Sequence, residues 1–67
     1  MNKKWHYTPR TKPDMDTIVI GFWINAENDK FVSLCFRDEF GDWYVAQDMP
    51  GDWCQFKQPR YWIETPD

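Results

Sequence analysis

The sequence contains few of the residues on which metal sites and disulfide-linked folds depend. Its 67 residues include one histidine, His6, and two cysteines, Cys35 and Cys54. The cysteines form no C-x-x-C pair, and together with His6 they match no zinc spacing and would need a fourth ligand. We therefore expect two reduced thiols, no metal site and no cofactor.

Catalytic groups are equally scarce. Histidine is the side chain that most often changes charge near neutral pH, so a general base would have to be His6 or a perturbed carboxylate. No serine, cysteine or carboxylate is tied to His6 by a motif, and the acidic turns at 14–16 and 38–42 lack the spacing of a calcium-binding loop. We expect no catalytic residue and no enzymatic activity.

The sequence also lacks a large excess of either charge and any long apolar run. It has 8 basic and 11 acidic side chains and a net charge of −3, which is too mild to mimic nucleic acid or to favour binding it. No apolar run approaches the roughly 18 residues that a membrane span needs, and the N-terminus has no apolar segment typical of a signal peptide. We expect a cytoplasmic protein that contacts no membrane.

Aromatic residues, in contrast, are abundant: 5 Trp, 5 Phe and 3 Tyr. A chain of this length forms one domain, residues 1–67, and buries only about 60% of its unfolded surface. Because an enclosed ring buries roughly 150–250 Å², the rings should supply much of the core. Some rings must also stay partly exposed, which favours self-association or a partner.

Residues 17–25 predict the central strand. Ile18, Ile20, Phe22 and Ile24 alternate with Val19, Gly21 and Trp23, so both faces of this strand are apolar. The β-branched and aromatic residues, with a glycine in the middle, favour a strand over a helix. We expect Ile20 to lie in the core.

The remaining segments predict further strands joined by turns. Residues 31–37 alternate cleanly, and we expect the face with Val32, Leu34 and Phe36 to be the core face. Residues 1–16 are expected to form an extended arm and a turn, although the rings at 5–7 would also suit a short strand, and 17–67 the sheet. Residues 53–58 are expected to be a loop, with a short strand or a short helix as the alternatives left open. The fold class is therefore mainly β: a single small antiparallel sheet of about four strands, twisted or partly closed, with little helix. The predicted strands are 17–25, 31–37, 43–47 and 59–64, and the predicted turns are 26–30, 38–42 and 48–52.

Two blocks, residues 12–20 and 59–66, resemble the small phage and prophage domain-of-unknown-function family 551. In that comparison Trp5 and Pro13 look like the family's opening, residues 18–20 like its first strand, Trp43 like its central tryptophan, and residues 61–66 like its closing motif. Tyr61 stands where the family usually has histidine, and Thr65 where it has leucine. The resemblance implies a phage or prophage origin and a small β-rich fold, and it brings no catalytic residues.

With catalysis excluded, we expect a phage- or prophage-encoded accessory protein that acts by protein–protein binding in the cytoplasm of the bacterial host. The partner would be a host or phage protein, and the effect would be inhibition of a host defence or regulatory factor. Exposed aromatic residues or a sheet edge would carry the contact, and they could equally join copies of the chain.

A small nucleic-acid- or nucleotide-binding module is the alternative. Residues 53–62 interleave rings with Lys57 and Arg60, as does a stacking platform for a single strand, although a lid over the core has the same pattern. Four more basic residues fall within positions 1–12. The candidate binding residues for either function are Trp53, Phe56, Lys57, Arg60 and Tyr61, with Trp53 expected to be the aromatic anchor.

Overall fold

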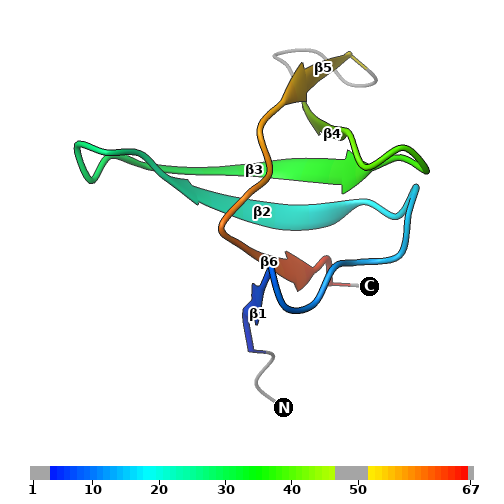
Figure 1. Cartoon of the computed structure of the whole chain (residues 1–67), viewed down its shortest axis with the longest axis horizontal. Coiled ribbons are helices and arrows are strands. Elements are labelled where there is room, and N and C mark those ends of the chain that lie inside the picture. Colours follow the sequence, from blue (N-terminus) through cyan, green and yellow to red (C-terminus); the bar gives the residue numbers. More distant parts are fainter. Residues whose placement is uncertain (1–3, 47–51, 67) are drawn as a thin grey trace.

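A single antiparallel sheet makes up the fold (Figure 1). The computed structural model describes residues 4–46 and 52–66. The strands stand in the order β1-β6-β2-β3-β4-β5, and the sheet is open, since β1 and β5 are its edges. No helix occurs among these residues, and so none that could cross a membrane. The strands are β1 (His6–Tyr7), β2 (Val19–Ile24), β3 (Lys30–Arg37), β4 (Trp43–Ala46), β5 (Trp53–Phe56) and β6 (Tyr61–Glu64).

The all-β, antiparallel prediction is confirmed, but the prediction of about four strands is wrong because there are six. One additional strand is β1, which lies within the expected arm and pairs with β6. The other is β5, in the segment 53–58 expected to be a loop, where Cys54 pairs with Val45 and Trp53 with Ala46. Pairing with β4 gives these backbone groups hydrogen-bond partners, a gain that a four-residue pattern does not reveal. Residues 48–51 of the expected turn at 48–52 lie outside the described residues.

The predicted central strand is confirmed as β2, which pairs with β3 on one side and β6 on the other. The hairpin loop after it is also as predicted. The Asn25 side-chain oxygen accepts hydrogen bonds from the backbone N–H groups of Glu27 and Asp29, each at 2.9 Å. Asn28 takes the left-handed conformation at φ 66°, which asparagine tolerates better than most residues.

The turn between β3 and β4 is held by one carboxylate. Asp38 Oδ1 accepts from the N–H groups of Asp42 and Phe40 at 2.9 and 3.0 Å, and the Tyr44 hydroxyl donates to Oδ2 at 3.2 Å. Partial desolvation opposes ionisation, but these donors, with Asp42 first, lower the pKa of Asp38 below its ordinary value. The turn leaves Phe40 80% exposed, clear of the core.

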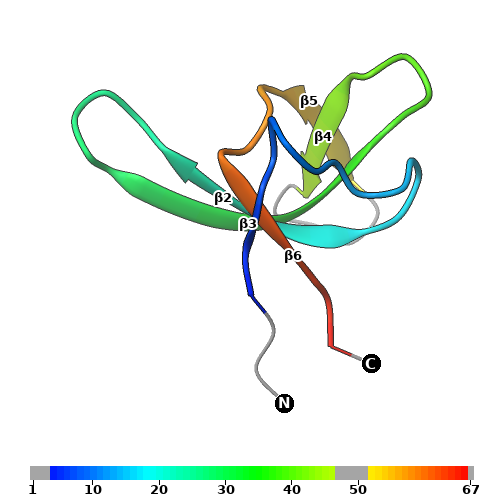
Figure 2. The ribbon, with the colours of Figure 1, turned by 60° about the horizontal axis from the view of Figure 1, so that its bottom comes forward.

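The core lies on one face of the sheet, which we call the covered face. Two connections cross it: residues 8–18, and the β5–β6 connection of residues 57–60 (Figure 2). Each is tied down by an indole, because Trp62 Nε1 donates to the Thr11 carbonyl at 2.6 Å and Trp23 Nε1 to the Lys57 carbonyl at 2.9 Å. The buried apolar side chains are Val19, Trp23, Cys35, Trp43, Val45 and Trp62.

The opposite face, which we call the open face, carries the side chains that the sequence pattern assigned to the core. That assignment is wrong for β3, because Val32 is 55% and Leu34 45% exposed, whereas Cys35 on the other face is fully buried. Ile20 is only half-buried. A chain of this length has enough residues outside the strands to cover only one face of the sheet. The hydrogen bonds from the Trp23 and Trp62 indoles hold these connecting segments on the covered face. From the strand register, the open face consists of Tyr7, Ile20, Phe22, Ile24, Lys30, Val32, Leu34, Phe36, Tyr44, Ala46, Trp53, Gln55, Tyr61 and Ile63.

The two thiols differ sharply in environment. Both cysteines are free; Cys54 is exposed, and burial of Cys35 raises its pKa to about 12. At pH 8 almost none of the Cys35 thiol would therefore be ionised. We expect a thiol reagent such as dithionitrobenzoate to react with one thiol per native chain and with two after denaturation. The control Cys54→Ser should show no reactive thiol when native, and rapid modification of Cys35 in the native protein would contradict its placement in the core.

Candidate functional site

The five candidate residues do not form one site. Trp53 and Tyr61 lie on the open face, whereas Phe56 and Lys57 lie on the covered side. Trp53 is half-buried, with its ring edge-on to Phe36 at a centroid distance of 4.8 Å. It is therefore engaged within its own sheet and is a poor choice for the free anchor.

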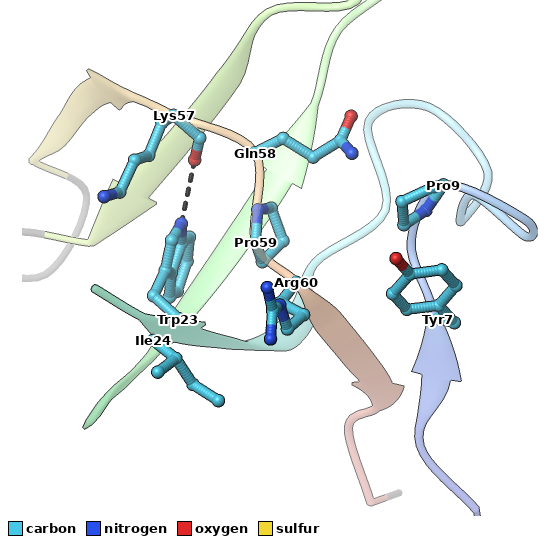
Figure 3. Close-up of a pocket in the computed structure, with 8 residues that line it drawn as sticks. All are labelled: Tyr7, Pro9, Trp23, Ile24, Lys57, Gln58, Pro59 and Arg60. Atoms are coloured by element: carbon cyan, nitrogen blue, oxygen red, sulfur yellow. Dashed lines mark hydrogen bonds between the residues drawn. The ribbon is translucent and has the colours of Figure 1, made fainter. Parts of the chain in front are cut away.

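A groove on the covered side brings the other three candidates, Phe56, Lys57 and Arg60, together. It consists of two adjoining hollows, of about 340 Å³ and about 300 Å³, which share Trp23 and Lys57 as lining residues. The larger hollow is also lined by Asn25, Asp29, Phe31 and Phe56. The smaller one, drawn in Figure 3, is also lined by Tyr7, Pro9, Ile24, Gln58, Pro59 and Arg60.

Three rings from three strands form one wall of the larger hollow. Trp23 of β2 contacts Phe31 of β3 and Phe56 of β5 at centroid distances of 5.2 and 5.6 Å, and the two phenylalanines are 6.0 Å apart. Trp23 is 3% exposed, yet Phe31 and Phe56 are 46% and 42% exposed. The buried indole thus fixes two phenyl rings that remain available to a ligand.

The β5–β6 connection that carries the two cations is held from both sides. Arg60 N donates to the Phe22 carbonyl at 2.9 Å, and Thr8 N donates to the Arg60 carbonyl at 3.0 Å. The hydrogen bond from Trp23 to the Lys57 carbonyl, dashed in Figure 3, adds a third attachment. The groove therefore has a fixed floor, because its backbone is fastened to β2 and to the segment after β1.

The charges of the groove do not converge on one point. Lys57 Nζ lies 5.9 Å from the centre of the Phe56 ring, and in Figure 3 the Lys57 and Arg60 side chains leave the connection in different directions. Asp29 lines the same hollow as Lys57. A phosphate group is best held by donors that point at it together, so this arrangement suits separate contacts along an extended ligand better than one phosphate.

Side chains that could together bind a metal ion are not gathered in the part of the chain that the structure describes. Within residues 4–46 and 52–66 no three His, Cys, Asp or Glu side chains gather closely enough to hold a metal ion. His6 Nε2 lies 3.0 Å from Glu64 Oε2, and its ring packs on Trp62 at 4.3 Å. This pair joins β1 to β6 and is a structural contact at the sheet edge.

The sequence analysis missed the ring that completes the groove. Phe31 was expected on the mixed face of its strand, with Ser33 and Arg37, and nothing in that pattern indicated a binding role. Its place beside Phe56 depends on β5 returning to the β2–β3 hairpin, a contact between residues 25 positions apart in sequence. Cross-strand contacts of this range leave no periodic signal in a single sequence.

Fold and groove together define a small all-β protein built on one open six-stranded antiparallel sheet. No protein-family model, curated protein or solved structure matches the chain. The resemblance to domain-of-unknown-function family 551 therefore stays a prediction, and the function is argued from the geometry.

Proposed function

We propose that this is a non-enzymatic protein-binding protein, and that its groove receives an apolar side chain of a partner protein next to an acidic one. The observation that carries the proposal is the pair of part-exposed rings, Phe31 and Phe56, fixed by the buried Trp23. Aromatic residues held rigidly at the surface give large contact area at low entropic cost, as at protein interfaces. Lys57 and Arg60 at the rim would pair with acidic groups of the partner.

The biological setting of the proposal rests on the sequence. The family resemblance supports a phage or prophage source and a partner among host or phage proteins, with inhibition of a host defence or regulatory factor as the expected effect. Binding to a nucleic acid or nucleotide remains the second candidate, because Lys57 lies over the Phe56 ring, and Arg60 lines the adjoining hollow with Tyr7. The net charge of −3 and the diverging cations favour the protein partner.

The two candidates predict different mutant patterns. For a protein partner, Phe56→Ala should weaken binding by about 2 kcal/mol or more, roughly thirtyfold, whereas Lys57→Ala with Arg60→Ala should cost little. The partner would be isolated on the tagged chain from bacterial lysate treated with nuclease, identified by mass spectrometry, and titrated by calorimetry at two salt concentrations. Phe40→Ala is the matched control, since Phe40 is an exposed ring that does not line the groove.

Circular dichroism would first establish that each variant folds. Two results together would contradict the protein-binding proposal: the double charge variant weakens binding more than Phe56→Ala does, and it lowers the slope of log K against log salt concentration by about 0.7 per lost phosphate contact. The ligand would then be a single-stranded nucleic acid.

A further inference from the structure

The open face is an apolar surface that nothing in the described structure covers. Tyr7, Val32 and Leu34 are 46%, 55% and 45% exposed. Among the described strand residues of this face, Lys30 at the β2–β3 hairpin is the one charged side chain. Antiparallel sheets that expose one face to water usually place polar residues there. An apolar face of this extent is typical of an interface.

We propose that the open face is the interface of a two-fold symmetric homodimer, in which the open faces of two copies pack together as the two layers of a β-sandwich. The proposal goes beyond the binding function proposed above, because Phe56 and Lys57, which carry the groove, lie on the covered side. Tyr7 and Ile24 of the open face also line the smaller hollow, so the two surfaces meet there.

The chain exposes more surface than a monomer of its mass usually does. A monomeric protein of 8.2 kDa exposes about 4,500 Å² by the usual scaling with mass, whereas this chain exposes 5258 Å². A sheet without a second layer produces a surplus of this kind, and a standard interface buries approximately 800 Å² on each partner. Packing one open sheet on another is also a common way to give a sheet its second layer.

The charge distribution favours a second copy over a charged partner. In a two-fold interface each residue meets residues of the identical surface, so a face with many charges of one sign would place like charges opposite one another. The open face avoids this repulsion, because Lys30 lies at its end and its centre holds only apolar side chains such as Ile20 and Leu34. Two copies can therefore associate without burying an unpaired charge.

The two halves of the face differ, and the same symmetry pairs one half with the other. One half, formed by β1, β6 and β2, has a hollow of about 260 Å³ lined by Trp5, Phe22 and Tyr61. The other half, formed by β3, β4 and β5, carries a cluster in which Phe36 stacks on Tyr44 and meets Trp53 edge-on. A two-fold axis parallel to the strands, between β2 and β3, places the half with the hollow over the half with the ring cluster of the second copy.

The test uses Leu34, which pairs with Ile20 across β2 and β3 and so lies next to this axis. The wild-type chain should sediment at twice its mass of 8.2 kDa at about 100 µM protein. Leu34→Glu and Leu34→Lys should each be monomers, because two like charges would meet at the axis, and an equimolar mixture should restore a dimer that native mass spectrometry identifies as mixed. The control Phe40→Glu, away from the face, should stay dimeric. A monomeric wild type, or single Leu34 variants that remain dimeric, would overturn the proposal.

A second variant covers the case in which a charge at Leu34 prevents folding. Ile20→Cys in a Cys54→Ser background places one accessible thiol beside the axis. A bis-maleimide whose linker spans the roughly 10 Å between two packed sheets should join this variant into a covalent dimer, whereas Phe40→Cys in the same background should not be joined. Failure of Ile20→Cys to cross-link would reject the interface, and it would leave the groove titrations with Phe56→Ala unaffected, so the two proposals can fail separately.

Discussion

Replacing Trp23 by alanine is expected to unfold most of the protein at room temperature. The indole is 3% exposed, contacts Phe31 and Phe56, and donates to the Lys57 carbonyl at 2.9 Å. Truncating a buried aromatic side chain to alanine costs about 3–5 kcal/mol of stability. Loss of the hydrogen bond to the Lys57 carbonyl costs about 1 kcal/mol more. The core of a domain of this size rarely supplies more than about 3–5 kcal/mol of net stability, so little would remain.

The measurement is urea denaturation followed by circular dichroism. Trp5→Ala is the matched control, because Trp5 is 45% exposed and meets Phe22 edge-on, and we expect it to cost about 1 kcal/mol. Trp23→Phe should fall between the two, since it keeps a ring but loses the N–H donor. A Trp23→Ala protein as stable as the Trp5→Ala protein would show that the β5–β6 connection is not anchored through this indole.

Gly21→Ala is expected to have the second largest effect on stability. A Cβ atom at Gly21 would lie 2.7 Å from Cys35 Sγ and 2.7 Å from Trp23 Cη2, closer than carbon and sulfur atoms approach one another in folded proteins. The glycine is required because the Trp23 ring folds back over it on the covered face. Overpacking of a core costs about 1–3 kcal/mol, and a rigid indole held by a hydrogen bond makes the upper end the expectation.

Combination with a smaller neighbour tests the cause. Gly21→Ala with Cys35→Ala should be less destabilised than the sum of the two single variants, because the double variant removes the sulfur that the new methyl group meets. Gly41→Ala is an informative control. Gly41 has open space around it but a φ of 87°, so alanine there should cost about 1 kcal/mol of backbone strain with no dependence on Cys35. Strict additivity at positions 21 and 35 would contradict close packing as the reason for the glycine.

The local features of the fold could be predicted from the sequence. The apolar run at 17–25 specified a central strand, because β-branched and aromatic residues on both faces suit a pleated strand between two others. The hairpin after Asn25 and the turn at 38–42 also followed from residues close in sequence, since Asn25 and Asp38 bond to backbone groups two and four positions ahead. Signals of this kind need no knowledge of the rest of the chain.

The candidate site was predictable only in part. Phe56, Lys57 and Arg60 fall in one short segment, and the tertiary structure keeps them around one groove. Trp53 and Tyr61 belong to the same segment but are on the open face, because alternation along β5 and β6 sends their side chains to the opposite side of the sheet. Because residues 53–58 were predicted to be a loop, the alternation of their side chains was not considered, and the candidates were not divided between the two faces.

Which face of the sheet is buried was decided by the tertiary structure alone. Val32 and Leu34 are as apolar as any core pair, and the alternation of their strand is satisfied whether its aliphatic or its mixed face is covered. The choice depends on where the two connections cross, and that is set by hydrogen bonds from Trp23 to Lys57 and from Trp62 to Thr11, over separations of 34 and 51 residues. The composition of a strand and the alternation of its apolar residues show which side chains it can bury. Long-range contacts determine which of those side chains are buried.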